Sequence, residues 1–171
     1  MPDSVYRLQN KRVLVTGSDQ GIGQAIALRL AKEGCDLVIN FRSNEEGALD
    51  TVKQAESFGR RAIAVKADIG QHTELEQLME ESFQALGSLD FLVNNAGIEK
   101  NADFVNVKEQ DYQSVVAVNM TGPFFLAQLF AQRLKDRKQS GKIVNISSVH
   151  VALPLPHFAP YCNAKAGLKM M

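Results

Sequence analysis

Short apolar runs alternate with longer amphipathic segments along the chain, and this alternation predicts strands and helices in turn. Five runs are nearly continuous in apolar and β-branched character, as is typical of strands covered on both faces of a parallel sheet. The segment after the first run places Ile22, Ile26 and Leu30 on one helical face, and Gly34 is expected to stop that helix. The five predicted strands are residues 12–17, 36–41, 61–68, 89–95 and 142–147.

Further helices are predicted between these strands. Residues 44–59 form a polar amphipathic pattern that ends at a glycine. The next helix opens with the capping-box pattern Thr73-Glu74-Leu75-Glu76 and ends at Gly87. A longer pattern runs from about Glu109 to Lys138 and contains Gly122-Pro123, where we expect a local kink because proline cannot donate a helical hydrogen bond.

The order of these elements decides the expected fold class. Alternating strands and helices indicate βαβ units with parallel pairing and right-handed crossovers. The sequence contains no linker, repeat or charge run that would divide it. We therefore expect residues 1–171 to form one domain of the α/β class, with a doubly wound parallel sheet of the Rossmann type in a three-layer α/β/α arrangement.

Composition and charge exclude several functions. Nineteen basic and nineteen acidic residues cancel, so the chain lacks the positive field that non-specific nucleic-acid binding requires. No apolar stretch reaches the ~20 residues needed to cross a bilayer, and residues 1–10 carry no apolar leader segment. Cys35 and Cys162 lie far apart without metal-ligand spacing, which favours reduced thiols, a cytoplasmic location and no metal site.

A glycine-rich turn follows the first predicted strand directly, and a predicted helix follows the turn. It reads TGSDQGIG over residues 16–23. Glycines here permit a tight turn, let the backbone approach a pyrophosphate and allow close packing of helix on strand. The N-terminus of the helix offers free N–H groups and the positive end of its dipole to phosphates. The turn therefore predicts a dinucleotide site, the alternative being a turn that only ends a strand.

The spacing G-x-x-x-G-x-G resembles the TGxxxGIG motif of the short-chain dehydrogenase/reductase family. Further matches follow in the family's order and cover essentially the whole chain. They are Asp68-Ile69 after the third strand, Asn94-Asn95-Ala96-Gly97 after the fourth, Asn119 in the long helix, and Ser148, Tyr161 and Lys165.

The resemblance implies an oxidoreductase that transfers a hydride between a nicotinamide cofactor and a hydroxyl/carbonyl substrate. Residues 40–46, 94–104 and 146–171 are similar to the corresponding stretches of bacterial glucose 1-dehydrogenases, a branch of that family. A sugar such as glucose is therefore the favoured small-molecule substrate. A 3-oxoacyl-carrier-protein reductase is the alternative within the same chemistry, and a cofactor-binding module without catalysis is the alternative from another class.

The resemblance also assigns catalytic roles. Tyr161 and Lys165 stand four residues apart and so share one helix face. Tyr161 is implied as the general acid/base, and Lys165 as the cation that supports it and holds the nicotinamide ribose. Ser148 is implied as the donor to the substrate oxygen, with Ser147 as the neighbouring alternative. Asn119 is implied as the holder of a water in the proton relay, or else as an asparagine that satisfies a local backbone group.

The implied cofactor contacts come from four parts of the chain. Asp68 is implied as the acceptor for the adenine amino group, and its alternative role is to cap a helix. The others lie in the glycine-rich turn, after the third and fourth strands and in the catalytic pair: Gly17, Ser18, Gly21, Ile22, Gly23, Ile69, Asn95, Gly97, Tyr161 and Lys165.

The end of the second strand bears on the choice between NAD and NADP. NAD sites place an acidic residue there, whereas an arginine accommodates the 2′-phosphate of NADP. Here Arg42 and Ser43 occupy this position, and no carboxylate precedes Glu45. The alternative for Arg42 is a solvated side chain. The turn residues 18–20 lack the basic residue that many NADP-preferring members carry, so we expect NADP with NAD also possible.

The resemblance also bears on the last part of the fold. Family members continue past the helix of Tyr161 into further strands, whereas this sequence stops at Met171. It thus implies a fold that lacks its last strands, and a homo-oligomer, a tetramer in the full-length family. The fifth strand then has an open apolar edge, which templates association between chains. For residues 1–171 alone we expect aggregation or dependence on a partner, and little dehydrogenase activity.

Overall fold

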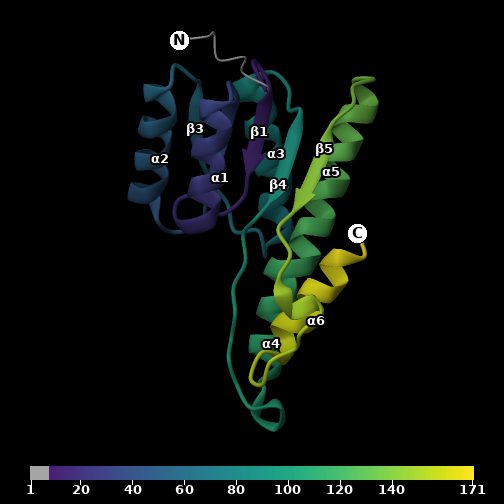
Figure 1. Cartoon of the computed structure of the whole chain (residues 1–171). Coiled ribbons are helices and arrows are strands. Elements are labelled where there is room, and N and C mark those ends of the chain that lie inside the picture. Colours follow the sequence, from purple (N-terminus) through teal and green to yellow (C-terminus); the bar gives the residue numbers. More distant parts are fainter. Residues whose placement is uncertain (1–7) are drawn as a thin grey trace.

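A computed structural model describes residues 8–171, which form a parallel five-stranded sheet between two layers of helices (Figure 1). Part of the N-terminal stretch that lacks a leader pattern, residues 1–7, lies outside the described residues. The strand order is β3-β2-β1-β4-β5, so the chain reverses its direction of winding between β1 and β4. The strands are β1 Arg12–Val15, β2 Asp36–Phe41, β3 Ala62–Lys66, β4 Phe91–Asn94 and β5 Lys142–Asn145.

The doubly wound parallel sheet expected from the sequence is therefore confirmed, and its burial explains the apolar runs. Val13, Leu14 and Val15 of the central strand are fully buried. Leu14 faces the layer of α3 and α5, while Val13 and Val15 face the layer of α1 and α2. Because successive side chains enter opposite cores, the strand needs apolar residues at every position.

The helices begin and end near the predicted positions. Gly34, Gly59 and Gly87 follow the first three helices with positive φ angles of 96°, 74° and 77°, as left-handed stop residues do. The helices are α1 Gly21–Lys32, α2 Glu45–Ser57, α3 His72–Leu86, α4 Glu109–Val116, α5 Gly122–Asp136 and α6 Ala159–Lys169, with a π-helical turn η2 over Ala117–Thr121.

The buried face of α1 differs from the expected one. Gly23, Ala27 and Ala31 face the sheet, whereas Ile22 is 67% exposed. Small residues on this face let the helix lie close to the strands that precede and follow it, and this close approach outweighs the larger apolar area of isoleucine. Ile26 and Leu30 are half-buried and flank the small-residue face.

The start of α3 also differs. Instead of the capping box at residues 73–76, the helix begins at His72, and Gln71 precedes it with no side-chain cap. The carboxylate of Glu74 accepts a hydrogen bond from the N–H of Asp68 at 2.7 Å. The acidic residue in the first turn therefore fixes the end of β3 to α3, and the capping-box prediction is wrong.

The long helical segment is continuous over Glu109–Asp136, and its irregularity lies one turn before Pro123. The N–H of Gly122 donates to the carbonyl of Ala117, five residues back, which defines the π-helical turn η2. Pro123 has no N–H to offer the carbonyl four residues before it, that of Asn119. By length and composition this segment is apolar enough to span a membrane. In the fold, α5 packs against α3 and contributes Phe130 to the core.

Strand β5 lies at the edge of the sheet. It pairs with β4, and residues 8–171 place no strand on its other side. Ile143 and Val144 are 41% and 47% exposed. Beyond the carboxyl ends of the strands, α6 packs against α4 and η2 (Figure 1).

Candidate active site

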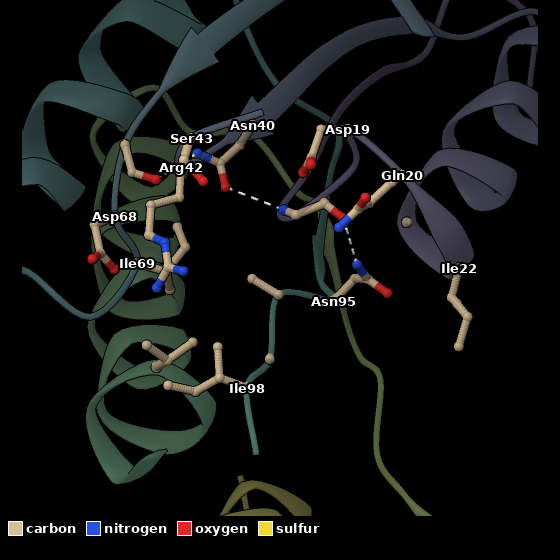
Figure 2. Close-up of a pocket in the computed structure, with 16 residues that line it drawn as sticks. Asp19, Gln20, Ile22, Asn40, Arg42, Ser43, Asp68, Ile69, Asn95 and Ile98 are labelled. Atoms are coloured by element: carbon tan, nitrogen blue, oxygen red, sulfur yellow. Dashed lines mark hydrogen bonds between the residues drawn. The ribbon is translucent and has the colours of Figure 1, made fainter. Parts of the chain in front are cut away.

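A pocket of about 340 Å³ lies where the strand order reverses, at the carboxyl ends of β1, β2 and β4 (Figure 2). Ligands of open α/β sheets bind in the crevice at this point. Most of the cofactor contacts implied by the sequence line it. These are Gly17, Ile22, Gly23, Arg42, Ser43, Asp68, Ile69, Asn95 and Gly97.

The glycine-rich turn has no room for side chains on its inner side. Gly17 adopts a positive φ of 58°, and a Cβ on it would lie 3.0 Å from the Cα of Ala96. A Cβ on Gly23 would overlap the carbonyl oxygen of Gly17. Glycine at both positions lets the first turn of α1 pack against the end of β1, which leaves its backbone N–H groups open to a phosphate.

Polar side chains bind the end of β4 to the same turn. The side-chain nitrogen of Asn95 donates to the carbonyl of Gly17 at 2.9 Å (Figure 2) and to the carbonyl of Thr16, also at 2.9 Å. The hydroxyl of Thr16 accepts from the N–H groups of Asn95 and Ala96, both at 3.0 Å. Three of these four bonds are made by Asn95, and together they join the residues that follow β1 and β4 at the wall of the pocket.

Asn40 is a site residue whose role the sequence analysis missed. Its side-chain oxygen accepts from the N–H of Gly17 at 3.2 Å, and its nitrogen donates to the carbonyls of Val65 and Ala67 (Figure 2). The side chain is 1% exposed, so these bonds hold the ends of β1, β2 and β3 together. The available signal was a polar residue inside the apolar strand DLVINF.

The opposite rim carries Arg42 and Ser43, both exposed, directly after β2. None of the ion pairs within residues 8–171 involves Arg42. Asp68 closes its own turn, because one carboxylate oxygen accepts from the N–H of Gly70 at 2.8 Å. It does not cap α3, which begins after Gln71.

A buried polar pair adjoins this pocket through Gly97. A Cβ on Gly97 would lie 3.1 Å from the side-chain oxygen of Asn119 and 3.8 Å from Nζ of Lys165. Lys165 is 3% exposed, and its Nζ donates to the carbonyl of Ile146 at 2.8 Å. Burial lowers the pKa of this lysine.

Asn119 sits in the π-helical turn and is fully buried. Its oxygen accepts from the N–H of Ile98 at 2.8 Å, and its nitrogen donates to the carbonyl of Ile98 at 2.6 Å. The backbone group that it satisfies is therefore not local but 21 residues away, in the segment after β4. Asn119 joins the long helix to the pocket wall.

Tyr161 and Ser148 lie outside the residues that line the pocket, on the side of Lys165. The ring of Tyr161 has its centroid 5.7 Å from Nζ of Lys165 and meets the ring of His150 edge-on at 5.8 Å. His150 stacks on Phe158 at 5.0 Å. The hydroxyl of Ser148 accepts from the N–H of His150 at 3.2 Å. The aromatic contacts of His150 had no sequence signal, because they join a loop to a helix.

Two implied cofactor contacts are placed differently from expectation. Ser18 is fully buried, its hydroxyl donates to the carbonyl of Val15 at 2.7 Å, and its N–H donates to Asn40. Its polar groups stabilise the turn from inside and do not reach the pocket. Gly21 also lies outside the pocket lining, with a φ of 58° that lets the chain enter α1.

The pocket and the adjoining group of polar side chains are suited to different chemical tasks. The pocket offers backbone N–H groups, an arginine and an aspartate, which suit a ligand with phosphates at its centre and a nucleoside at one end. The adjoining group offers a phenol beside a buried lysine. Phenol and ammonium side by side can move a proton to or from a bound oxygen.

Comparisons with known proteins agree with this geometry. The family model described as short chain dehydrogenase matches residues 11–171. The chain is 42% identical to 3beta-hydroxysteroid dehydrogenase 1 of Eggerthella lenta over 96% of its own length and 63% of that protein's. It is 36% identical to glucose 1-dehydrogenase 2 of Bacillus subtilis, over 96% of its length and 64% of that protein's.

A solved structure shares the same backbone. The gluconate 5-dehydrogenase of Burkholderia cenocepacia J2315, in complex with NADP and tartrate, superposes with a TM-score of 0.88 at 36% identity. The match covers 97% of this chain and 64% of that one. The chain thus spans somewhat less than two thirds of the length of these relatives, and their printed substrates differ from one another. On the family model, the relatives and the fold, the chain belongs to the short-chain dehydrogenase family.

Proposed function

We propose that this protein is an NAD(P)-dependent oxidoreductase that transfers a hydride between the nicotinamide and a hydroxyl/carbonyl substrate. Residues 1–171 are its dinucleotide-binding domain. The observation that carries the proposal is the continuity of the site. A phosphate-binding turn opens into a pocket whose wall, at Gly97, touches a buried lysine and asparagine, and a tyrosine lies beside that lysine.

The chain's own residues divide the binding of a dinucleotide between them. Gly17, Ile22 and Gly23 receive the pyrophosphate on the backbone of the turn. Asp68 accepts from the adenine amino group with the carboxylate that closes its own turn, beside Ile69. The remaining contacts are Asn95 and Gly97 along the channel, Arg42 and Ser43 at a 2′-phosphate, and Tyr161 and Lys165 at the nicotinamide ribose.

The proton chemistry belongs to the residues beside the pocket. The nicotinamide, when bound, accepts or donates the hydride. Tyr161 takes the proton from the substrate hydroxyl, or returns it to the carbonyl oxygen. Ser148 donates a hydrogen bond to the same oxygen and stabilises the charge that develops there. Lys165 favours the anionic form of the phenol through its positive charge, and Asn119 holds the wall beside it through Ile98.

The first experiment measures cofactor binding by the full-length protein. Titration with NADPH and NADH, followed by their fluorescence, should give saturable binding of both, tighter for NADPH. Arg42→Asp should weaken NADPH binding by at least about tenfold and NADH binding much less, because the charge-assisted bonds to the 2′-phosphate are lost. Arg29→Asp, an exposed site on α1, is the matched control and should leave both affinities unchanged. No binding of either dinucleotide would overturn the proposal.

For the substrate we propose a sugar-type hydroxyl compound, as the resemblance to glucose 1-dehydrogenases and the 36% identity to a glucose and a gluconate dehydrogenase support. The second candidate is a hydroxysteroid. The 42% identity to a hydroxysteroid dehydrogenase favours it, as do Val149 and Leu153, which are 66% and 58% exposed in the loop before Tyr161. Initial rates with glucose, gluconate, a 3β-hydroxysteroid and a 3-oxoacyl thioester distinguish these classes. We further propose a cytoplasmic homo-oligomer, as the family resemblance implies.

A further inference from the structure

An aspartate lines the pocket from an unexpected place, the glycine-rich turn. The end of β2 carries Arg42 and no acidic residue. Asp19, in the glycine-rich turn, nevertheless lines the same pocket as Arg42 (Figure 2). The two charges therefore face one cavity from different strand–helix connections.

The start of α2 holds the Asp19 carboxylate in position. The side-chain nitrogen of Asn44 donates to Oδ2 of Asp19 at 3.2 Å, and the side-chain oxygen of Asn44 accepts from the N–H of Gly47 at 3.1 Å. Asn44 is thus both the cap of α2 and the partner of Asp19, and it stands directly after Arg42 and Ser43.

The backbone restricts Asp19 as well. A Cβ on Gly47 would lie 2.5 Å from the carbonyl oxygen of Asp19, so the turn and the first turn of α2 are in contact. No ion pair between described residues involves Asp19 or Arg42. Neither charge is therefore neutralised by a salt bridge of its own, and both act on whatever occupies the pocket.

We propose that Asp19 determines cofactor specificity through its interaction with the 2′ position of the adenine ribose, where its effect opposes that of Arg42. A carboxylate accepts a hydrogen bond from the 2′-hydroxyl of NAD and repels the 2′-phosphate of NADP. The acidic residue that NAD sites place at the end of the second strand is supplied here from the glycine-rich turn. Together the two residues make the protein use both cofactors, with the preference for NADP smaller than Arg42 alone would give. This inference rests on the proposed function.

The test compares Asp19→Asn with the wild-type full-length protein. The substitution keeps the size and the oxygen that bonds Asn44, and it removes the charge. NADPH should bind about tenfold more tightly because the repulsion is lost. NADH should bind about threefold more weakly because a neutral amide accepts less strongly from the 2′-hydroxyl. Asp50→Asn, an exposed aspartate on α2 outside the pocket, removes the same charge elsewhere and should change neither affinity.

Two further measurements separate an electrostatic role from a structural one. Adenosine 2′,5′-bisphosphate and AMP carry only the adenosine end, so Asp19→Asn should shift their affinities in the same directions as those of NADPH and NADH. Raising the salt to about 1 M shortens the screening length to about 3 Å, so the gain for NADPH should shrink. A structural perturbation would weaken all four ligands together at either salt concentration.

Each outcome bears on a definite part of the inference. If the wild type binds neither dinucleotide, the proposed function fails and this inference fails with it. If both bind and Asp19→Asn leaves their affinity ratio within twofold of the wild type, the role of Asp19 is refuted and the proposed function stands. A gain for NADPH that is insensitive to salt also refutes it.

Discussion

The two ends of the candidate site are held by different kinds of contact. At the cofactor end, Asn40, Thr16 and Asn95 bind the ends of four parallel strands to one another through buried hydrogen bonds to backbone groups. At the reaction end, Tyr161 stands on α6 and Ser148 on a short turn after an edge strand. The bond from Lys165 to Ile146 links these two segments.

This difference separates binding from chemistry. The cofactor end is formed mainly by backbone groups of the glycine-rich turn. Removing a single side chain at the rim of the pocket should therefore leave this turn in place. The reaction end depends on a few side-chain atoms: Nζ of Lys165 donates to the carbonyl of Ile146, and the hydroxyl of Ser148 accepts from the N–H of His150. Changes at Tyr161 should therefore alter turnover far more than cofactor binding, and changes at the glycines should alter binding.

The largest expected effect is at Tyr161. Tyr161→Phe in the full-length protein should lower kcat about a thousandfold, because the proton donor and acceptor is lost. The NADPH dissociation constant should stay nearly unchanged, because Tyr161 is only one of many proposed cofactor contacts, most of which line the pocket. Steady-state rates and fluorescence titration measure the two. Tyr112→Phe, at an exposed tyrosine on α4, is the control. Substantial residual turnover in Tyr161→Phe would show that Tyr161 does not take part in the chemistry.

The reverse pattern is expected at Gly23. Gly23→Ala places a methyl group against the carbonyl of Gly17, so it should cost at least about 2 kcal/mol of unfolding free energy and weaken both dinucleotides strongly. Urea denaturation and titration measure these effects. Gly21→Ala meets no atom within 4 Å and should incur only the left-handed backbone penalty of about 1 kcal/mol. Equal effects of the two substitutions would contradict the proposed role of the close contact between Gly23 and Gly17 in cofactor binding.

The exposed edge of β5 gives a third prediction. A polypeptide of residues 1–171 should associate or aggregate, with little dehydrogenase activity, because Ile143 and Val144 lie on an unpaired strand. Val144→Lys should reduce that association, which light scattering measures. Val105→Lys, at an exposed site in the short 3-10 helix Phe104–Asn106, is the control. A monomer of normal turnover from the unsubstituted polypeptide would contradict the prediction.

The smallest effect is a change in pH dependence. Burial lowers the pKa of Lys165 below its usual value of 10.5. At pH values between the lowered pKa of the folded protein and 10.5, the unfolded chain therefore binds more protons than the folded one. Stability from this residue therefore rises as the pH increases through that window. Lys165→Met should flatten the rise in urea midpoint as the pH approaches 10.5 from below, whereas Lys169→Met, exposed on the same helix, should not. An unchanged slope in Lys165→Met would show that the lysine titrates normally.

Much of the fold followed from local pattern. The apolar runs predicted all five strands; β1, β2 and β4 are buried on both faces, whereas the edge strand β5 is largely exposed. Glycines marked the helix ends because only they adopt left-handed backbone without strain. The face of α1 was misjudged because hydrophobicity ranks Ile22 above Ala27, whereas the distance between helix and sheet decides which one is buried.

The site was predictable where a motif fixes backbone, and less so where distant side chains meet. The glycine-rich turn and Gly97 lie where their motifs place them. Ser18 turns inward because its hydroxyl donates to the carbonyl of Val15. The sequence of the turn does not indicate this orientation. The bond between Asp19 and Asn44 joins residues 25 apart, and no local pattern encodes it. The catalytic roles and the cofactor preference stay predictions.

The π-helical turn at Ala117–Thr121 determines which face the following helix, α5, presents to the core. It contains one residue more than a regular α-helical turn, and in an uninterrupted α-helix that extra residue would rotate everything after it by about 100°. Leu126, Phe130 and Leu134 would then leave the core that they share with α3. The wide turn therefore absorbs the extra residue and keeps the buried face of α5 directed at α3.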